Sequence, residues 1–84
     1  MRVVLKLFAS LSDLLPPQAR ASNALELDVD PATTIAELIA QQRVPEKSAH
    51  LVLVNGQFVP PETRATRTLC ANDELAIWPP VAGG

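Results

Sequence analysis

Apolar and polar residues alternate in the first segment of the chain, residues 2–8, and again at 25–29, where acidic residues separate leucines and a valine. A period of two is typical of a strand with one buried face. Short apolar runs at 51–54 and 75–78 predict two further strands, and 57–59 predicts a brief fifth one.

Helical spacing occurs in two places. A short helix is predicted at 10–15, with Leu11, Leu14 and Leu15 on one side and Ser10 as its N-cap, and a proline pair ends it. Thr34 and Glu37 have the spacing of a capping box, and the apolar residues that follow predict the main helix, to about residue 42.

The remaining segments are connections. Polar residues at 18–23 and 62–68 predict loops, and Asn55-Gly56 predicts a tight hairpin turn. The resulting order of strands with one main helix favours an α+β fold, a mixed sheet covered by that helix on one face. We expect one domain over 1–78 and a flexible tail over 79–84.

Composition narrows the function. The 84 residues include 7 Lys+Arg and 9 Asp+Glu, for a net charge of −2, which argues against nucleic-acid binding and a polybasic membrane patch. One cysteine and one histidine argue against a metal site. Lys6 interrupts the first apolar run, and no segment is long enough to span a membrane, so we expect a soluble cytoplasmic protein.

The carboxyl-terminal segment carries the most distinctive chemistry. Pro79 and Pro80 end the last predicted strand and favour an extended course. Gly83 and Gly84 have no Cβ, so their backbone could enter a narrow channel in a partner. The terminal carboxylate, once activated as an anhydride with AMP, would become an acyl donor. The alternative interpretation is an ordinary frayed terminus.

Three segments resemble the small subunit of molybdopterin synthase. Residues 73–84, Asp-Glu-Leu-Ala-Ile-Trp-Pro-Pro-Val-Ala-Gly-Gly, resemble its carboxyl terminus. Residues 7–14, Leu-Phe-Ala-Ser-Leu-Ser-Asp-Leu, and 54–56, Val-Asn-Gly, resemble its opening and its turn. The resemblance extends over nearly the whole chain, although Trp78 stands where the family usually has phenylalanine.

This resemblance implies a ubiquitin-like β-grasp fold and a sulfur carrier in molybdenum cofactor biosynthesis. Gly84 would be adenylated by a ubiquitin-activating-like enzyme that uses ATP, and then converted to a thiocarboxylate, with Gly83 providing access. The tail would donate sulfur to a cyclic pyranopterin precursor in the large synthase subunit, forming the dithiolene. The catalytic groups would belong to that partner, and the chain would bind no cofactor or metal of its own.

The strand periods also predict a docking surface. Phe8 and Trp78 fall opposite the expected core positions, so both should lie on the helix-free face of the sheet. In a β-grasp sheet the first and last strands would be neighbours, so these two aromatics could lie together there, and Phe58 could join them. The expected core positions are Leu5, Leu7, Leu75 and Ile77. We expect the partner to be contacted by Phe8, Phe58, Trp78, Pro79, Pro80, Val81 and Ala82.

Other chemistry-bearing residues have plainer interpretations. Asp73 and Glu74 could meet basic residues of a partner or simply form a solvated turn. Arg64 and His50 are expected at the surface, and Cys70 is expected to be a small buried residue. Three other functions stay open: a carrier for thiamine or another pathway, a ubiquitin-like binding module with an inert tail, and a modifier joined to lysines.

Overall fold

The computed structural model describes residues 1–80. The strands are β1 (Arg2–Leu7), β2 (Ala24–Asp28), β3 (Leu51–Val54), β4 (Gln57–Phe58) and β5 (Glu74–Trp78). The helices are α1 (Pro17–Arg20) and α2 (Ile35–Gln41), together with the 3-10 segments η1 (Ala9–Leu14), η2 (Glu46–Ser48) and η3 (Pro61–Thr63).

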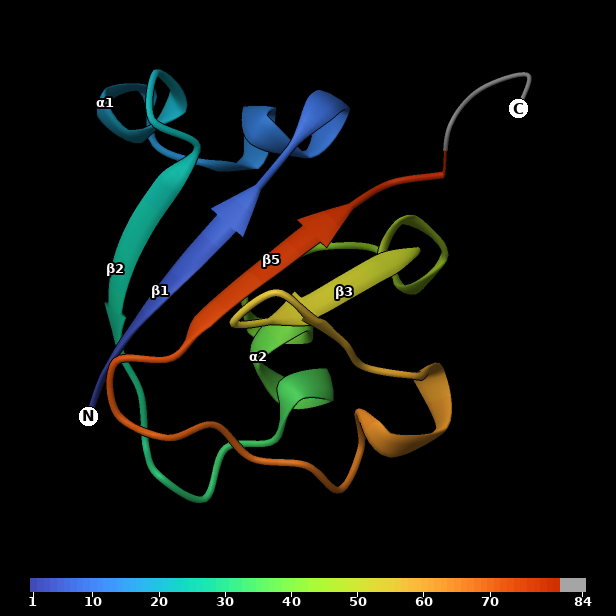
Figure 1. The fold of residues 1–84 in the computed structure, drawn as a ribbon. Coiled ribbons are helices and arrows are strands. Elements are labelled where there is room, and N and C mark those ends of the chain that lie inside the picture. Colours follow the sequence, from blue (N-terminus) through green and yellow to red (C-terminus); the bar gives the residue numbers. More distant parts are fainter. Residues whose placement is uncertain (81–84) are drawn as a thin grey trace.

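The strands form one mixed sheet in the order β2-β1-β5-β3-β4 (Figure 1). The first and last strands, β1 and β5, are parallel neighbours at its centre, and the other pairs are antiparallel. Leu5 lies opposite both Leu25 and Leu75 in this register. The expected adjacency of the first and last strands is confirmed, and their carboxyl ends therefore meet at one end of the sheet.

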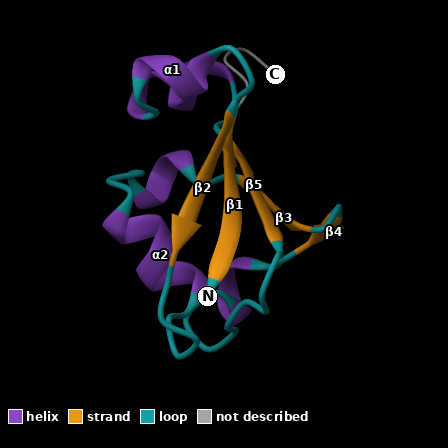
Figure 2. Ribbon diagram, turned by 90° about the vertical axis from the view of Figure 1, so that its left-hand side faces the viewer, coloured by secondary structure: helices purple, strands orange, loops and turns teal. Residues whose placement is uncertain are grey.

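The helix α2 covers one face of the sheet and leaves the other without a helix (Figure 2). The four expected core residues, Leu5, Leu7, Leu75 and Ile77, are at most 1% exposed, so the assignment of faces is confirmed. Burial of such side chains stabilises the fold by about 1.5–3 kcal/mol each. The core also contains Val3, Leu11, Leu15, Ile35, Leu38, Val52, Val54 and Val59.

Both ends of α2 are closed by hydrogen bonds. The Glu37 amide donates to the Thr34 hydroxyl at 3.1 Å, and the Thr34 amide donates to the Glu37 carboxylate at 3.0 Å, which confirms the predicted capping box. At the other end Arg43 has a φ of 62°, and the Val44 amide donates to the Ile39 carbonyl at 3.2 Å. Arginine here occupies the left-handed position where glycine is usual.

The predicted hairpin turn is also confirmed. Asn55 and Gly56 have φ values of 51° and 83°, as the tight turn between β3 and β4 requires. The Val59 amide donates to the Val52 carbonyl at 2.9 Å and continues the pairing beyond β4.

Expectations for residues 9–23 are partly wrong. The helix η1 is a 3-10 segment that begins after Phe8 without a side-chain cap, so Ser10 is not its N-cap. Leu14 is 44% exposed, because Leu15 follows the helix in an extended conformation and takes the buried position. The other predicted strand and helix ends lie within one residue of those observed, whereas the expected loop at 62–68 begins within the 3-10 segment η3.

The expected loop at 18–23 begins as the short helix α1. Pro17 stands in its first turn, where proline is already in a helical conformation, and Ala19 is buried. The Arg20 guanidinium donates to the Leu15 and Asp13 carbonyls at 3.0 Å each, which ties α1 to the end of η1. Tertiary contacts of this kind leave no periodic signal in four residues.

No helix within residues 1–80 is long and apolar enough to cross a membrane. The same part of the chain holds no group of three or more histidine, cysteine, aspartate or glutamate residues placed to bind a metal ion.

Candidate functional site

Two aromatic rings meet where β1 and β5 end. The Phe8 and Trp78 rings stack with their centroids 4.1 Å apart and their planes 4° from parallel. The Leu7–Ile77 pairing places them side by side, and the Phe8 amide donates to the Ile77 carbonyl at 3.2 Å. Both side chains are partly exposed, so the predicted aromatic pair on the helix-free face is confirmed.

Ala9 follows the stacked phenylalanine in an unusual conformation. Its φ of 53° lies in the left-handed region, which alanine rarely adopts. The chain turns here from β1 into η1, and the Leu11 amide donates to the Phe8 carbonyl at 3.1 Å. This left-handed residue therefore turns the chain from β1 into η1 immediately after Phe8, whose side chain is partly exposed.

The last described residues leave the sheet beside this stack. The Trp78 carbonyl accepts from the His50 amide at 3.2 Å, so strand pairing holds the chain up to the point where Pro79 begins. Pro79 is half-buried and Pro80 is exposed. A shallow hollow of about 440 Å³ lies at this point, lined by Ala9, Ser10, His50, Leu51, Trp78, Pro79 and Pro80.

The predicted sulfur-bearing residues Gly83 and Gly84, and the predicted contact residues Val81 and Ala82, lie outside the described residues.

Phe58 does not belong to the aromatic stack. It lies on β4, opposite Leu53, and β3 separates it from β5. Its side chain is 55% exposed, and Leu51, opposite Trp78, is 37% exposed. The helix-free face therefore carries an apolar strip from Phe8 and Trp78 across Leu51 toward Phe58, and we call this the apolar strip.

Asp73 and Glu74 are held within the chain. The Asp73 carboxylate accepts from the Asn55 side-chain amide and from the Cys70 backbone amide, each at 2.8 Å. Glu74 forms an ion pair with Lys6 at 3.0 Å. Both carboxylates thus have partners within the chain, at the turn that leads into β5, and their contact with basic residues of a partner protein stays a prediction.

Cys70 is exposed, so the expectation of a buried cysteine is wrong. Cys70 lies at the surface in the turn that the Asp73 carboxylate closes, and the neighbouring Leu69 is buried instead. His50 is exposed, as expected, and meets the site only through its backbone and the wall of the hollow.

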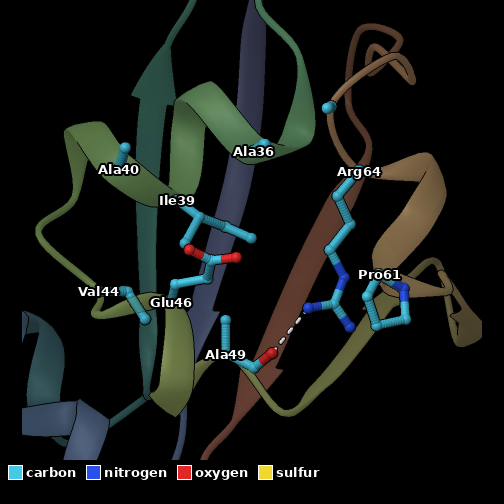
Figure 3. A pocket seen from close by; sticks show the side chains of 9 residues that line it. Ala36, Ile39, Ala40, Val44, Glu46, Ala49, Pro61 and Arg64 are labelled. Carbon is cyan, nitrogen blue, oxygen red and sulfur yellow. Dashed lines mark hydrogen bonds between the residues drawn. The ribbon is translucent and has the colours of Figure 1, made fainter.

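Arg64 is buried, which overturns the expectation of a surface arginine. Its side chain is 8% exposed and its guanidinium donates to the carbonyls of Ala49 at 2.7 Å, Val59 at 3.3 Å and His50 at 3.4 Å. Figure 3 shows it on one wall of a hollow of about 300 Å³, facing Ala49. Burial lowers the pKa of Arg64, and nearby Glu62 raises that pKa by a smaller amount.

This arginine joins segments that also support the site. The His50 residue that it binds pairs in turn with Trp78. A charged residue inside a polar loop carries no sequence signal for burial, because the carbonyls that receive it are distant in sequence. Reasoning from the sequence missed it for that reason.

The arrangement is that of a ubiquitin-like β-grasp domain, with a mixed five-stranded sheet and one main helix. The model of the ThiS family matches residues 5–84. The chain therefore belongs to the ThiS family, a family of ubiquitin-like sulfur carriers. No curated protein matches the chain in sequence.

Solved structures share the fold. SAMP1 from Haloferax volcanii is 26% identical with a TM-score of 0.68, and each chain is covered completely. A putative molybdopterin converting factor subunit 1 from Pyrococcus furiosus is 21% identical over 95% of this chain and 98% of that one, with a TM-score of 0.63. The complex of subunits 1 and 2 of the molybdopterin-converting factor from Helicobacter pylori gives 18% identity, full coverage of both chains and a TM-score of 0.59.

Proposed function

We propose that this chain carries sulfur on its terminal glycine for molybdenum cofactor biosynthesis, as the small subunit of a molybdopterin synthase. One observation carries the proposal: a ThiS-family domain ends its central strand beside a partly exposed aromatic stack, immediately before Pro-Pro-Val-Ala-Gly-Gly. We assign the chemistry of activation and sulfur transfer to partner proteins.

The chemistry begins with activation of a poor electrophile. The Gly84 carboxylate attacks the α-phosphorus of ATP in an adenylating enzyme, pyrophosphate leaves, and an acyl-adenylate forms. Hydrosulfide then attacks the acyl carbon and AMP leaves, which yields the terminal thiocarboxylate. A persulfide would instead form an acyl disulfide, whose S–S bond a thiol then cleaves to give the same thiocarboxylate and a disulfide. Gly83 and Gly84 present no side chain to the partner's active site, so they offer little steric resistance to this attack.

The apolar strip would be the surface that binds the partner. A partner that covers Phe8 and Trp78 would bury large aromatic surfaces, which dominate interface energetics. The Helicobacter pylori structure is a complex of two subunits, which supports a large subunit as a partner of this chain as well. Pro79 and Pro80 would guide the tail from the strip into that partner.

Sulfur transfer to a defined acceptor tests the proposal. The chain with a terminal thiocarboxylate is mixed with the large synthase subunit of the same organism and the cyclic pyranopterin precursor, and the dithiolene product is measured. We expect product from the full chain and none from a variant that lacks Gly84. If the thiocarboxylate forms but this mixture gives no product, the pterin is not the acceptor, and the chain carries sulfur for a thiamine-type or other pathway.

A protein modifier is the second candidate. A second solved structure, also 26% identical to this chain, is of the Haloferax volcanii small archaeal modifier protein 1. A modifier would form an amide between Gly84 and lysines of other proteins. Conjugates of higher mass that vanish when Gly84 is deleted would favour this function, and their absence from cells with an active activating enzyme would exclude it.

A further inference from the structure

The outer edge of β2 is an unpaired strand edge. β2 lies at one end of the strand order and pairs with β1 on its inner side only (Figure 1). Within residues 1–80, no hydrogen bond from outside the β1–β2 ladder reaches the backbone of Ala24, Glu26 or Asp28. An open edge of this kind is a template for an added strand.

The register shows which backbone groups point outward. Met1 and Val29 exchange hydrogen bonds in both directions, at 2.7 Å and 2.8 Å. Hydrogen-bonded and non-bonded pairs alternate in an antiparallel ladder, so Leu27 and Leu25 turn their amides and carbonyls toward β1. The amides and carbonyls of Ala24, Glu26 and Asp28 therefore face away from the sheet.

The side chains of β2 differ between its two faces. Leu25 and Leu27 are half-buried against the margin of the core on the α2 side. Glu26 and Asp28 are 67% and 81% exposed on the helix-free side. A strand added at this edge would thus meet apolar surface on one face and carboxylates on the other.

The inner edge of β2 already pairs with a strand of matching pattern. β1 places Val3 and Leu5 beside the leucines, while the Arg2 guanidinium reaches Glu26 at 2.9 Å. The terminal amino group of Met1 lies 3.0 Å from Asp28, and their hydrogen bond lowers the pKa of that carboxyl. Basic groups thus complement β2 on its carboxylate side.

A second copy of this chain meets like charges at this edge when its β2 strand pairs about Glu26. An antiparallel pairing of two β2 strands centred on Glu26 would place the two Glu26 carboxylates directly opposite each other. Like charges at opposite positions destabilise a strand pair. Charge complementarity instead favours a partner with lysine or arginine at alternate positions.

We propose that the outer edge of β2 binds an extended segment of another protein, in antiparallel orientation, with apolar residues alternating with lysine or arginine. The basic residues lie opposite Glu26 and Asp28, and the apolar residues extend the core margin at Leu25 and Leu27. Main-chain hydrogen bonds to Ala24, Glu26 and Asp28 hold the segment. This surface is separate from the tail, so it stands or falls independently of sulfur transfer.

A peptide titration followed by NMR tests the proposal. A capped peptide, Lys-Val-Arg-Val-Lys-Val, is added to the ¹⁵N-labelled full chain. We expect saturable shifts of the Ala24, Glu26 and Asp28 amides and slower hydrogen exchange at those amides. The acidic peptide Glu-Val-Glu-Val-Glu-Val should bind at least about tenfold more weakly, because like charges would face each other.

Backbone methylation identifies the bonding edge without altering the protein. In antiparallel pairing the basic residues opposite Glu26 use their own amides, so N-methylation of the three basic residues should abolish binding, and N-methylation of the three valines should preserve it. Equal binding of both methylated peptides, or of a peptide with the same composition but no alternation, would overturn the proposal. If the amide shifts instead depend on protein concentration in the absence of peptide, the occupant of this edge is a second copy of the chain and not another protein.

A protein variant provides an independent check. Glu26→Pro removes an outward amide together with the Glu26 carboxylate but no hydrogen bond of the β1–β2 ladder, so the ladder should persist while peptide binding is lost. Glu26→Gln keeps the amide, and its binding should be weakened but still detectable. Undiminished binding to a folded Glu26→Pro chain would contradict the proposal.

Discussion

Arg64 shows how much one side chain contributes at the residue scale. Its guanidinium satisfies carbonyls from three residues, Ala49, His50 and Val59, none of which adjoins it in sequence. It has no carboxylate within ion-pair distance among the described residues, so its charge is balanced by carbonyl dipoles. This arrangement joins the end of β4 to the segment that precedes β3, and through His50 to Trp78.

Removal of these donors should destabilise the domain. We expect Arg64→Met to lower the free energy of unfolding by about 2–4 kcal/mol, because it leaves buried carbonyls without partners. Arg67→Met, at an exposed position nearby, should change it by less than about 0.5 kcal/mol. Urea denaturation of both variants measures the difference, and equal stabilities would show that the Arg64 hydrogen bonds contribute nothing.

Ala9 stores backbone strain next to the aromatic stack. Glycine adopts a φ of 53° without a Cβ clash, so Ala9→Gly should leave stability unchanged or raise it by up to about 1 kcal/mol. Ala40→Gly, at an exposed position in the last turn of α2, should instead lower stability, by up to about 1 kcal/mol. Thermal melts compare the two, and a similar loss in both variants would argue against strain at Ala9.

At the scale of elements, the capping box of α2 links stability to pH. Hydrogen bonds from the Thr34 backbone amide and hydroxyl lower the pKa of Glu37. A carboxyl whose pKa is lowered by folding stabilises the fold above its ordinary pKa of 4.5, and this contribution is lost as the pH falls through the lower pKa of the folded state.

Two substitutions separate the cap from the charge. Thr34→Ala should lower stability at neutral pH by about 1 kcal/mol and flatten the loss of stability below pH 4.5. Glu37→Gln should flatten the same acid dependence with a smaller loss at neutral pH. Unfolding free energies measured from pH 7 down to pH 3 would show this, and an acid dependence identical to that of the unaltered chain would refute the linkage.

The elements that could be predicted from sequence share a local signal. Alternation located β1 and β2, a short apolar run located β5, the Thr34–Glu37 spacing located the start of α2, and Asn55-Gly56 located the hairpin turn. The stack of Phe8 on Trp78 also followed from the period of two, once the first and last strands were taken as neighbours. Local rules and tertiary structure agree at these positions.

The errors occurred where distant contacts decide the outcome. Arg64 is buried by carbonyls from residues fourteen and fifteen positions earlier, and α1 is tied down by Arg20. Phe58 shares the face of the stack but is separated from it by a strand, which depends on the order of β3 and β4 in the sheet. Sequence periodicity specifies a face of the sheet but not the distance across it.

At the scale of the whole molecule, the apolar strip and the tail should act together. Trp78→Ala should weaken the affinity for the large synthase subunit by about 2 kcal/mol, which is roughly thirtyfold in Kd, because it removes the aromatic anchor beside the tail. Phe58→Ala, farther along the strip, should weaken it less. Calorimetric titration of folded variants measures both, and an unchanged affinity of Trp78→Ala would remove this residue from the interface.

The most direct test of the central claim is the intact mass of the untagged chain after incubation with its activating enzyme, ATP and a sulfur donor. We expect a gain of about 16 Da, the exchange of one oxygen for sulfur, localised to Gly84 and absent when Gly84 is deleted. An unchanged mass, with the same enzyme shown to be active on another carrier, would contradict the account and leave a binding domain whose apolar strip serves another purpose.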